Sequence, residues 1–172
     1  MPLPQPMRTP RLLLSPLTAG EIAAFHGLIT DAHVRRFVVD GAVMPLEWAA
    51  EQVERSLGLF ERIGSGLWLA RPPGGAGEPI GFCGFVDLSH SGLGPELIYA
   101  LREAGTGAGL ATEMARSMID HARLHVGVGR ILASVDAVNE RSVRVLEKLG
   151  FRVIETRQGA FGKLLVFGLG EG

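Results

Sequence analysis

Residues 95–126, PELIYALREAGTGAGLATEMARSMIDHARLHV, decide the fold class of this chain because they join a strand to a helix through a glycine-rich loop. Three glycines stand at alternate positions, Gly105, Gly107 and Gly109. Apolar residues then recur every three to four positions, which is the spacing of an amphipathic helix with one buried face. A glycine-rich turn at a helix start presents free N–H groups beside the positive end of the helix dipole, so this point favours a phosphate group.

Composition restricts the class of protein. The chain has 172 residues, 47% of them hydrophobic and 20% charged, which is typical of a globular domain. With 17 basic and 18 acidic side chains it lacks the basic excess expected of a nucleic-acid partner. The single cysteine, Cys83, excludes an internal disulfide framework. No apolar run has the length of a signal core or a membrane span, so we expect a soluble cytoplasmic protein with no membrane partner.

The order of elements predicts an α/β (α+β) fold. Residues 1–10 carry four prolines and are expected to form a flexible arm, and residues 11–172 a single domain. We predict strands at 11–14, 67–70, 80–88, 95–101, 130–135, 151–156 and 163–169. A helix between 101 and 130 makes the neighbouring strands parallel, and the other junctions are hairpins. The prediction is a mixed, mostly antiparallel sheet of about seven strands, flanked by about four helices.

Three phosphate-binding patterns compete for the glycine loop. A P-loop needs a lysine after its last glycine, and none follows here. A dinucleotide fingerprint needs glycine or alanine at its sixth position, which is Leu110 or Thr112 depending on the starting glycine. The remaining pattern is Gly-x-Gly-x-Ala at a helix start, from Gly107 to Ala111, whose backbone N–H groups can wrap a pyrophosphate.

Two blocks of this sequence, 95–122 and 135–152, resemble the core motifs of the Gcn5-related N-acetyltransferases (GNAT). The more specific signature is Asn139, Ser142, Gly150 and Phe151, and the similarity extends over most of residues 9–169. Within the family the sequence is most similar to the RimJ/RimL-type branch of ribosomal-protein N-acetyltransferases. The resemblance implies a GNAT-like domain in which the parallel central strands splay around acetyl-CoA, with CoA as the product.

The resemblance also implies a set of cofactor-binding residues. The strand supplies backbone groups from Ile98, Tyr99, Ala100 and Leu101, the loop supplies Thr106, Gly107, Ala108, Gly109, Leu110 and Ala111, and Asn139 touches the pantetheine arm. The family usually carries Gln, Arg or an aromatic residue in place of Thr106, and aromatic residues in place of Leu110 and Ala100. These departures leave the backbone N–H groups of the loop available to the pyrophosphate, but they bear on how tightly acetyl-CoA is bound.

Two residues are candidates for the chemistry of acetyl transfer to an amine. The acceptor ammonium must lose a proton, and the departing thiolate benefits from gaining one. Glu96, at the start of the cofactor strand, is the candidate base, acting directly or through water; the alternative is a solvated carboxylate at a strand end. Ser142 is the candidate proton donor to the thiolate; the alternative is a first-turn serine that bonds the helix backbone.

The resulting functional hypothesis is an acetyl-CoA-dependent N-acetyltransferase that works by direct attack in a ternary complex. The acceptor is a protein N-terminal α-amine or a similar primary amine. Two alternatives stay open: a small-molecule acetyltransferase for aminoglycosides or polyamines, and a non-catalytic acyl-CoA-binding module. Loops at 28–48, 88–95 and 156–163 carry no readable code for the acceptor, and the oligomeric state, a homodimer included, is also open. His121 and His125 are expected at the surface, with no metal site.

Overall fold

The structure, a computed structural model, describes residues 2–87, 95–127 and 129–170. Eight strands form one sheet in the order β1-β2-β3-β4-β5-β6-β8-β7. The strands are β1 (Met7–Arg8), β2 (Leu13–Pro16), β3 (Leu67–Arg71), β4 (Gly81–Asp87), β5 (Pro95–Leu101), β6 (Ile131–Asp136), β7 (Arg152–Gly159) and β8 (Gly162–Leu169). The helices are α1 (Ile22–Thr30), α2 (Ala32–Val38), α3 (Leu46–Ile63), α4 (Leu110–His121) and α5 (Glu140–Lys148).

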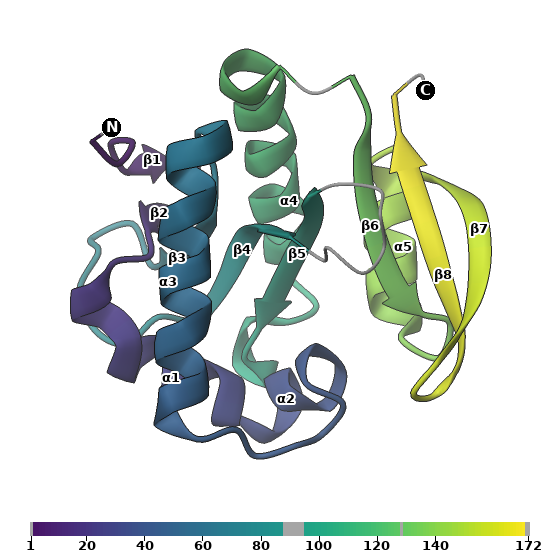
Figure 1. Cartoon of the computed structure of the whole chain (residues 1–172), viewed down its shortest axis with the longest axis horizontal. Coiled ribbons are helices and arrows are strands. Elements are labelled where there is room, and N and C mark those ends of the chain that lie inside the picture. The colour runs from purple at the N-terminus through teal and green to yellow at the C-terminus, as the bar shows by residue number, and fades with distance from the viewer. Residues whose placement is uncertain (1, 88–94, 128, 171–172) are drawn as a thin grey trace.

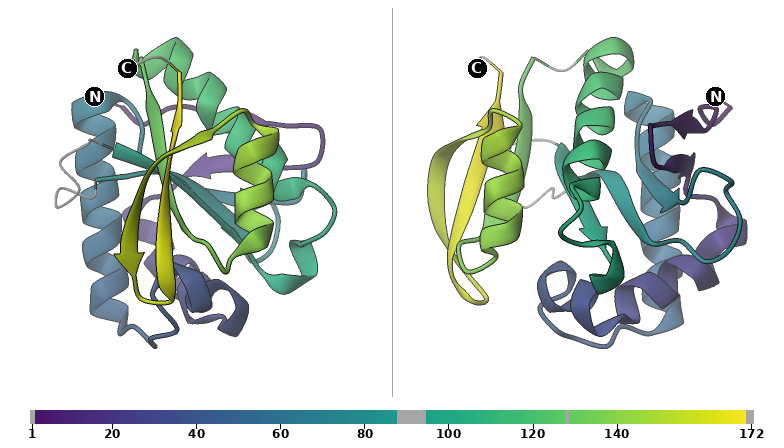
Figure 2. Two further views of the ribbon diagram at one scale, coloured as in Figure 1. Left: turned by 90° about the vertical axis from the view of Figure 1, so that its right-hand side faces the viewer. Right: turned by 180° about the vertical axis from the view of Figure 1, so that it is seen from behind.

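The helices cover both faces of the sheet. Figures 1 and 2 show α1 and α3 on one face and α4 and α5 on the other, with α2 at one end of β5. Strand β3 explains this arrangement, because its residues alternate between two apolar clusters. Leu67 and Leu69 pack with α1 and α3, whereas Trp68 and Ala70 pack with α4. A strand buried on both faces reads as a continuous apolar run, as LWLA does.

The predicted topology is confirmed. β3 and β4 form the expected antiparallel hairpin, and β5 and β6 are the parallel pair joined through α4. The sheet has one strand more than the expected seven, because Met7 and Arg8, in the segment expected as an arm, pair with Leu13 and Leu14. Residues 88–94 lie outside the described residues. They include Leu88, the last residue of the predicted strand 80–88, and most of the loop 88–95 that we expected to bear on the acceptor.

The prediction for His121 was wrong. Its side chain is 6% exposed, its ring lies 5.3 Å from that of Trp68, and its Nε2 is 3.1 Å from the carbonyl oxygen of Gly64. The ring packs on Trp68 of β3 and reaches Gly64, the residue at which α3 ends, and helix periodicity does not reveal such a tertiary contact. Burial lowers the pKa of His121, and the nearby charge of His125 lowers it further.

Candidate functional site

A cavity of about 730 Å³ lies between the carboxyl end of β5, the start of α4, and helices α2 and α5. From β5 and the loop after it, the lining includes Tyr99, Ala100, Leu101, Thr106, Gly107 and Gly109. The start of α4 contributes Leu110, Ala111 and Thr112. Because α2, at the end of β5, packs with the cluster of α1 and α3 whereas α5 covers the other face, the cavity is bounded by elements from both sides of the sheet (Figures 1 and 2).

The cavity exists because the two parallel strands diverge. In the described part of the chain, β5 and β6 share one registered pair, Glu96 with Leu132, near the start of each strand. β4, in contrast, pairs with β5 along all seven residues of the latter. Beyond Glu96, the backbone groups of β5 that face away from β4 therefore lie beside the opening rather than in a sheet ladder. An extended ligand with amide groups can bond to such a strand edge.

The glycine loop forms the end of the cavity at the start of α4. Gly107 and Gly109 have φ angles of 82° and 81°, in the left-handed region that favours glycine. A Cβ built on Gly107 meets nothing within 4 Å. A larger residue is therefore disfavoured at this position by the left-handed backbone conformation and not by lack of space. Gly109 is the N-cap of α4 and provides no side chain to bond the first helical N–H groups. Those donors are available to an anion.

Helix α5 and its N-cap supply about half of the polar residues that line the cavity. Asn139 is its N-cap, as predicted, and its Oδ1 accepts a hydrogen bond of 3.4 Å from the backbone N of Ser142. Arg141, Arg144 and Lys148 also line the cavity. The Arg141 guanidinium donates to the Thr106 hydroxyl at 3.2 Å, which joins α5 to the glycine loop.

The sequence analysis did not identify these three cations. Their spacing of i, i+3 and i+7 places them along one side of a helix. This spacing alone could have predicted a positively charged helix face. His33, Arg36 and Phe37 from α2 also line the cavity, but nothing local in the sequence indicates that α2 approaches β5.

Tyr99 connects strand β5 to helix α5. Its hydroxyl donates a hydrogen bond of 3.1 Å to the backbone carbonyl oxygen of Ser142. Burial raises the pKa of the Tyr99 phenol above its usual range, although the hydrogen bond to Ser142 acts in the opposite direction. Tyr99 is therefore a neutral donor at working pH, and it forms part of the cavity wall. The Ser142 hydroxyl lines the same cavity and bonds to no residue that the structure describes.

Glu96 lies apart from the cavity lining. It is 3% exposed and sits where β5 and β6 begin to diverge. Along β5 it alternates onto the same face as Ile98 and Ala100, which pack toward the cluster of α1 and α3. Tyr99 points to the opposite face, where α4 packs. The two catalytic candidates, Glu96 and Ser142, are thus on different sides of the gap.

Most of the predicted site residues come together in space. Ten line the cavity, namely Tyr99, Ala100, Leu101, Thr106, Gly107, Gly109, Leu110, Ala111, Asn139 and Ser142. Glu96, Ile98 and Ala108 do not. The residues present fit a long phosphate-bearing cofactor: a strand edge that, among the described residues, joins no ladder beyond Glu96, an uncapped helix start behind two left-handed glycines, and three cations on α5.

Three further observations limit the chemistry that the described residues can offer. Cys83 is fully buried on β4, and burial raises the pKa of its thiol far above the usual range, so it is an inert core residue. Among residues 2–87, 95–127 and 129–170, no three His, Cys, Asp or Glu side chains gather where they could hold a metal ion. In the same residues, no helix combines the length and apolar surface needed to span a bilayer.

Comparison with known proteins places these features in a family. Residues 11–152 match the family model for the acetyltransferase (GNAT) domain. An uncharacterized N-acetyltransferase, p20, from Bacillus licheniformis is 30% identical over 91 residues, 51% of this chain and 51% of that protein. The chain thus spans about half the length of the curated relatives it matches.

Solved structures share the fold at lower sequence identity. The ribosomal L7/L12 α-N-protein acetyltransferase RimL, solved with coenzyme A, superposes with a TM-score of 0.77 at 16% identity, over 97% of this chain and 96% of that one. An aminoglycoside acetyltransferase solved with coenzyme A gives 0.72 at 20% identity, over 92% and 93%. Since both acceptor classes occur on this fold, the fold alone does not select the acceptor.

Proposed function

Because this chain belongs to the acetyltransferase (GNAT) family, we propose that it is an acetyl-CoA-dependent N-acetyltransferase that acylates a primary amine. The observation that carries the proposal is the cavity at the diverging ends of β5 and β6, which is bounded by elements of both faces. Such an opening allows a cofactor and an acceptor amine to approach one point from opposite sides. That geometry suits direct attack in a ternary complex.

The phosphates and the pantetheine arm of acetyl-CoA have partners of matching chemistry in the cavity. The pyrophosphate is assigned to the N–H groups of the turn at Gly107 and Gly109 and of the first residues of α4. Arg144 and Lys148 supply positive charge for the remaining phosphate. The amides of the pantetheine arm are assigned to the open edge of β5 and to Asn139. When bound, acetyl-CoA supplies an acetyl thioester near the middle of the cavity.

The reaction requires a base on the acceptor side and a donor on the sulfur side. We assign the base to Glu96, which is buried where the strands diverge and shares a face with Ala100, a cavity residue. We assign the donor to the Ser142 hydroxyl, with Tyr99 holding the Ser142 backbone in place. The amine nitrogen bonds to the carbonyl carbon and its proton passes to Glu96 or to a water that Glu96 holds. The carbon–sulfur bond breaks with its electron pair on sulfur, and the leaving thiolate accepts a hydrogen bond from the Ser142 hydroxyl and becomes the CoA thiol by protonation.

The acceptor that we propose is a protein N-terminal α-amine. Support comes from the RimJ/RimL-type motifs of the sequence. An α-amine has an ordinary pKa near 8, so it needs less help from a base than a lysine amine near 10.4. A single buried carboxylate such as Glu96 is sufficient for that task.

Release of CoA thiol, measured with a panel of amines, tests this function. The panel contains peptides beginning with Ala or Ser, the same peptides with blocked N-termini, and an aminoglycoside and a polyamine. We expect turnover with free peptide N-termini only, with intact-mass analysis showing one added acetyl group. Turnover with the aminoglycoside or the polyamine alone would show that the acceptor is a small molecule and not a protein N-terminus. CoA binding with no acceptor-dependent release of thiol would favour a non-catalytic acyl-CoA-binding module.

A further inference from the structure

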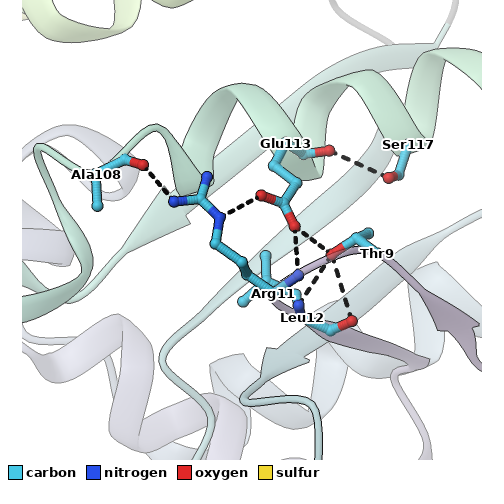
Figure 3. Close-up of polar contacts among 6 residues, drawn as sticks. All are labelled: Thr9, Arg11, Leu12, Ala108, Glu113 and Ser117. Atoms are coloured by element: carbon cyan, nitrogen blue, oxygen red, sulfur yellow. Dashed lines mark hydrogen bonds and ion pairs between the residues drawn. The ribbon is translucent and has the colours of Figure 1, made fainter.

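The hairpin of β1 and β2 packs its tip against the start of α4 (Figure 3). The tip is a tight turn, in which the backbone N of Thr9 donates to the carbonyl oxygen of Leu12 at 2.9 Å. The backbone N of Leu12 donates to the Thr9 hydroxyl oxygen, also at 2.9 Å. These two bonds leave Pro10 and Arg11 at the end of the turn.

Glu113, in the first turns of α4, orients the Arg11 side chain. Its Oε1 accepts from the Arg11 backbone N at 2.9 Å and from the Thr9 hydroxyl, and its Oε2 accepts from Arg11 Nε at 2.8 Å. Burial would raise the pKa of this carboxyl, but the hydrogen bonds from Thr9 and Arg11 and the Arg11 charge outweigh it and hold the pKa below its ordinary value. The carboxylate is thus a charged anchor at working pH.

The other end of the guanidinium reaches the glycine loop. Arg11 Nη1 donates a hydrogen bond of 2.7 Å to the carbonyl oxygen of Ala108, as Figure 3 shows. Ala108 lies between the two left-handed glycines, Gly107 and Gly109. In a planar trans peptide the C=O and the following N–H point in opposite directions. Fixing the Ala108 carbonyl on Arg11 therefore turns the Gly109 N–H away from Arg11.

The cavity lies on that far side of the loop. Gly107 and Gly109 line it, whereas Ala108 and Arg11 do not. We propose that Arg11 is a positioning residue for the phosphate-binding turn: it holds the turn from behind, by way of the Ala108 carbonyl, so that the Gly109 N–H faces the cavity. This role rests on the proposed function, in which that N–H binds the pyrophosphate of CoA. The guanidinium bonds Glu113 and Ala108 at once through donors that its planar fork holds at fixed angles.

Replacing Arg11 with Gln is the central test. We expect the Kd for CoA, measured by calorimetry, to rise about tenfold, as for the loss of one hydrogen bond to a charged group. The KM for acetyl-CoA rises in parallel, while kcat at saturation stays within about twofold. S-acetyl-pantetheine, which lacks the pyrophosphate, is used with unchanged kcat/KM. That last readout separates positioning of the turn from a general loss of structure.

Arg62→Gln is the matched control. Arg62 is an exposed arginine whose Nη2 bonds Asp87 at 2.7 Å, but neither residue lines the cavity. We expect its Kd for CoA to equal that of the wild type. In Arg11→Gln the negative charge of Glu113 has lost its partner and lies near the bound phosphates. The double variant Arg11→Gln/Glu113→Gln removes that negative charge as well. If Arg11 acts through position, the double variant stays about as weak as the single one.

Three results would overturn the role of Arg11: an unchanged Kd in Arg11→Gln, an equal loss with S-acetyl-pantetheine, or recovery of affinity in the double variant. The last of these would mean that Arg11 only balances the Glu113 charge. Failure of the wild-type chain to bind CoA at all would instead overturn the proposed function, and this role with it.

Discussion

The Tyr99 hydroxyl and the backbone carbonyl oxygen of Ser142, 3.1 Å apart, connect strand β5 to helix α5 across the opening between the two parallel strands. Both residues line the cavity, and each comes from one of the two motif blocks of the sequence. β5 and β6 share one registered pair in the described residues, so the sheet ladder does little to set the width of the opening. The hydrogen bond from Tyr99 is a direct restraint on that width.

Tyr99→Phe removes this restraint and leaves the ring in place. We expect the free energy of unfolding to fall by about 1 kcal/mol, the usual net contribution of one hydrogen bond. In a domain of this size the melting temperature then falls by about 2–4 °C. The Kd for CoA rises severalfold because α5 is less well fixed against β5. Thermal unfolding with and without CoA measures both effects, and a variant identical to the wild type in both would contradict the restraint.

Glu96→Gln and Ser142→Ala test the assignment of the two chemical roles. Removing a general base typically lowers kcat by about 10²-fold or more, so we expect that loss for Glu96→Gln with an unchanged Kd for CoA. Ser142→Ala should lower kcat to a smaller extent, because a water molecule can replace a hydroxyl donor. If Glu96 is only a buried strand residue, kcat will be unaffected by the substitution, and only unfolding measurements will register the change.

Two glycine substitutions separate backbone strain from helix propensity. Gly107→Ala places a Cβ at a φ of 82°, and since nothing lies within 4 Å of that Cβ, the cost is the left-handed conformation, about 1–2 kcal/mol. Gly58→Ala, in the middle of α3, also meets nothing within 4 Å but has an ordinary φ. It should stabilise the chain by about 0.5–1 kcal/mol. Urea unfolding of both variants tests the pair; equal effects would contradict it.

Asp136→Asn tests a buried carboxyl group at the end of β6. Its side chain is 8% exposed, and Oδ1 has no hydrogen-bond partner among the described residues. Burial raises its pKa, the charge of Asp40 raises it further, and a hydrogen bond from the Phe161 backbone partly opposes both. The folded state therefore holds this proton to higher pH than the unfolded chain, and stability is lost as pH rises through the folded pKa.

We accordingly expect Asp136→Asn to stabilise the chain by about 1 kcal/mol at pH 7, because it removes the cost of a buried charge. Because the pKa of the folded-state carboxyl is raised, a larger fraction of it is protonated at pH 4 than at pH 7, so the gain should be smaller at pH 4. Urea unfolding of both proteins at the two pH values measures the difference. A gain of equal size at pH 4 and pH 7 would show that ionisation of Asp136 is not its source.

The sequence by itself determined the elements and most of the cofactor-binding residues. The glycine loop, the N-cap at Asn139 and the apolar run LWLA each have a local physical cause: left-handed backbone, a side-chain acceptor for free N–H groups, and burial on both faces. Because the loop and the cap sit at the starts of α4 and α5, the α-helices that follow β5 and β6, their positions in the sequence already implied one shared site.

Only the tertiary structure decided what lies around that site. His121 is buried because its ring packs on Trp68 of β3 and reaches the carbonyl oxygen of Gly64. Arg11 reaches Ala108 because a hairpin from the start of the chain folds against residues about a hundred positions later. Glu96 and Ser142 lie on different sides of the gap because β5 alternates its side chains and diverges from β6. Contacts between distant segments depend on how whole elements pack, and the periodicity of apolar residues within one element does not predict that packing.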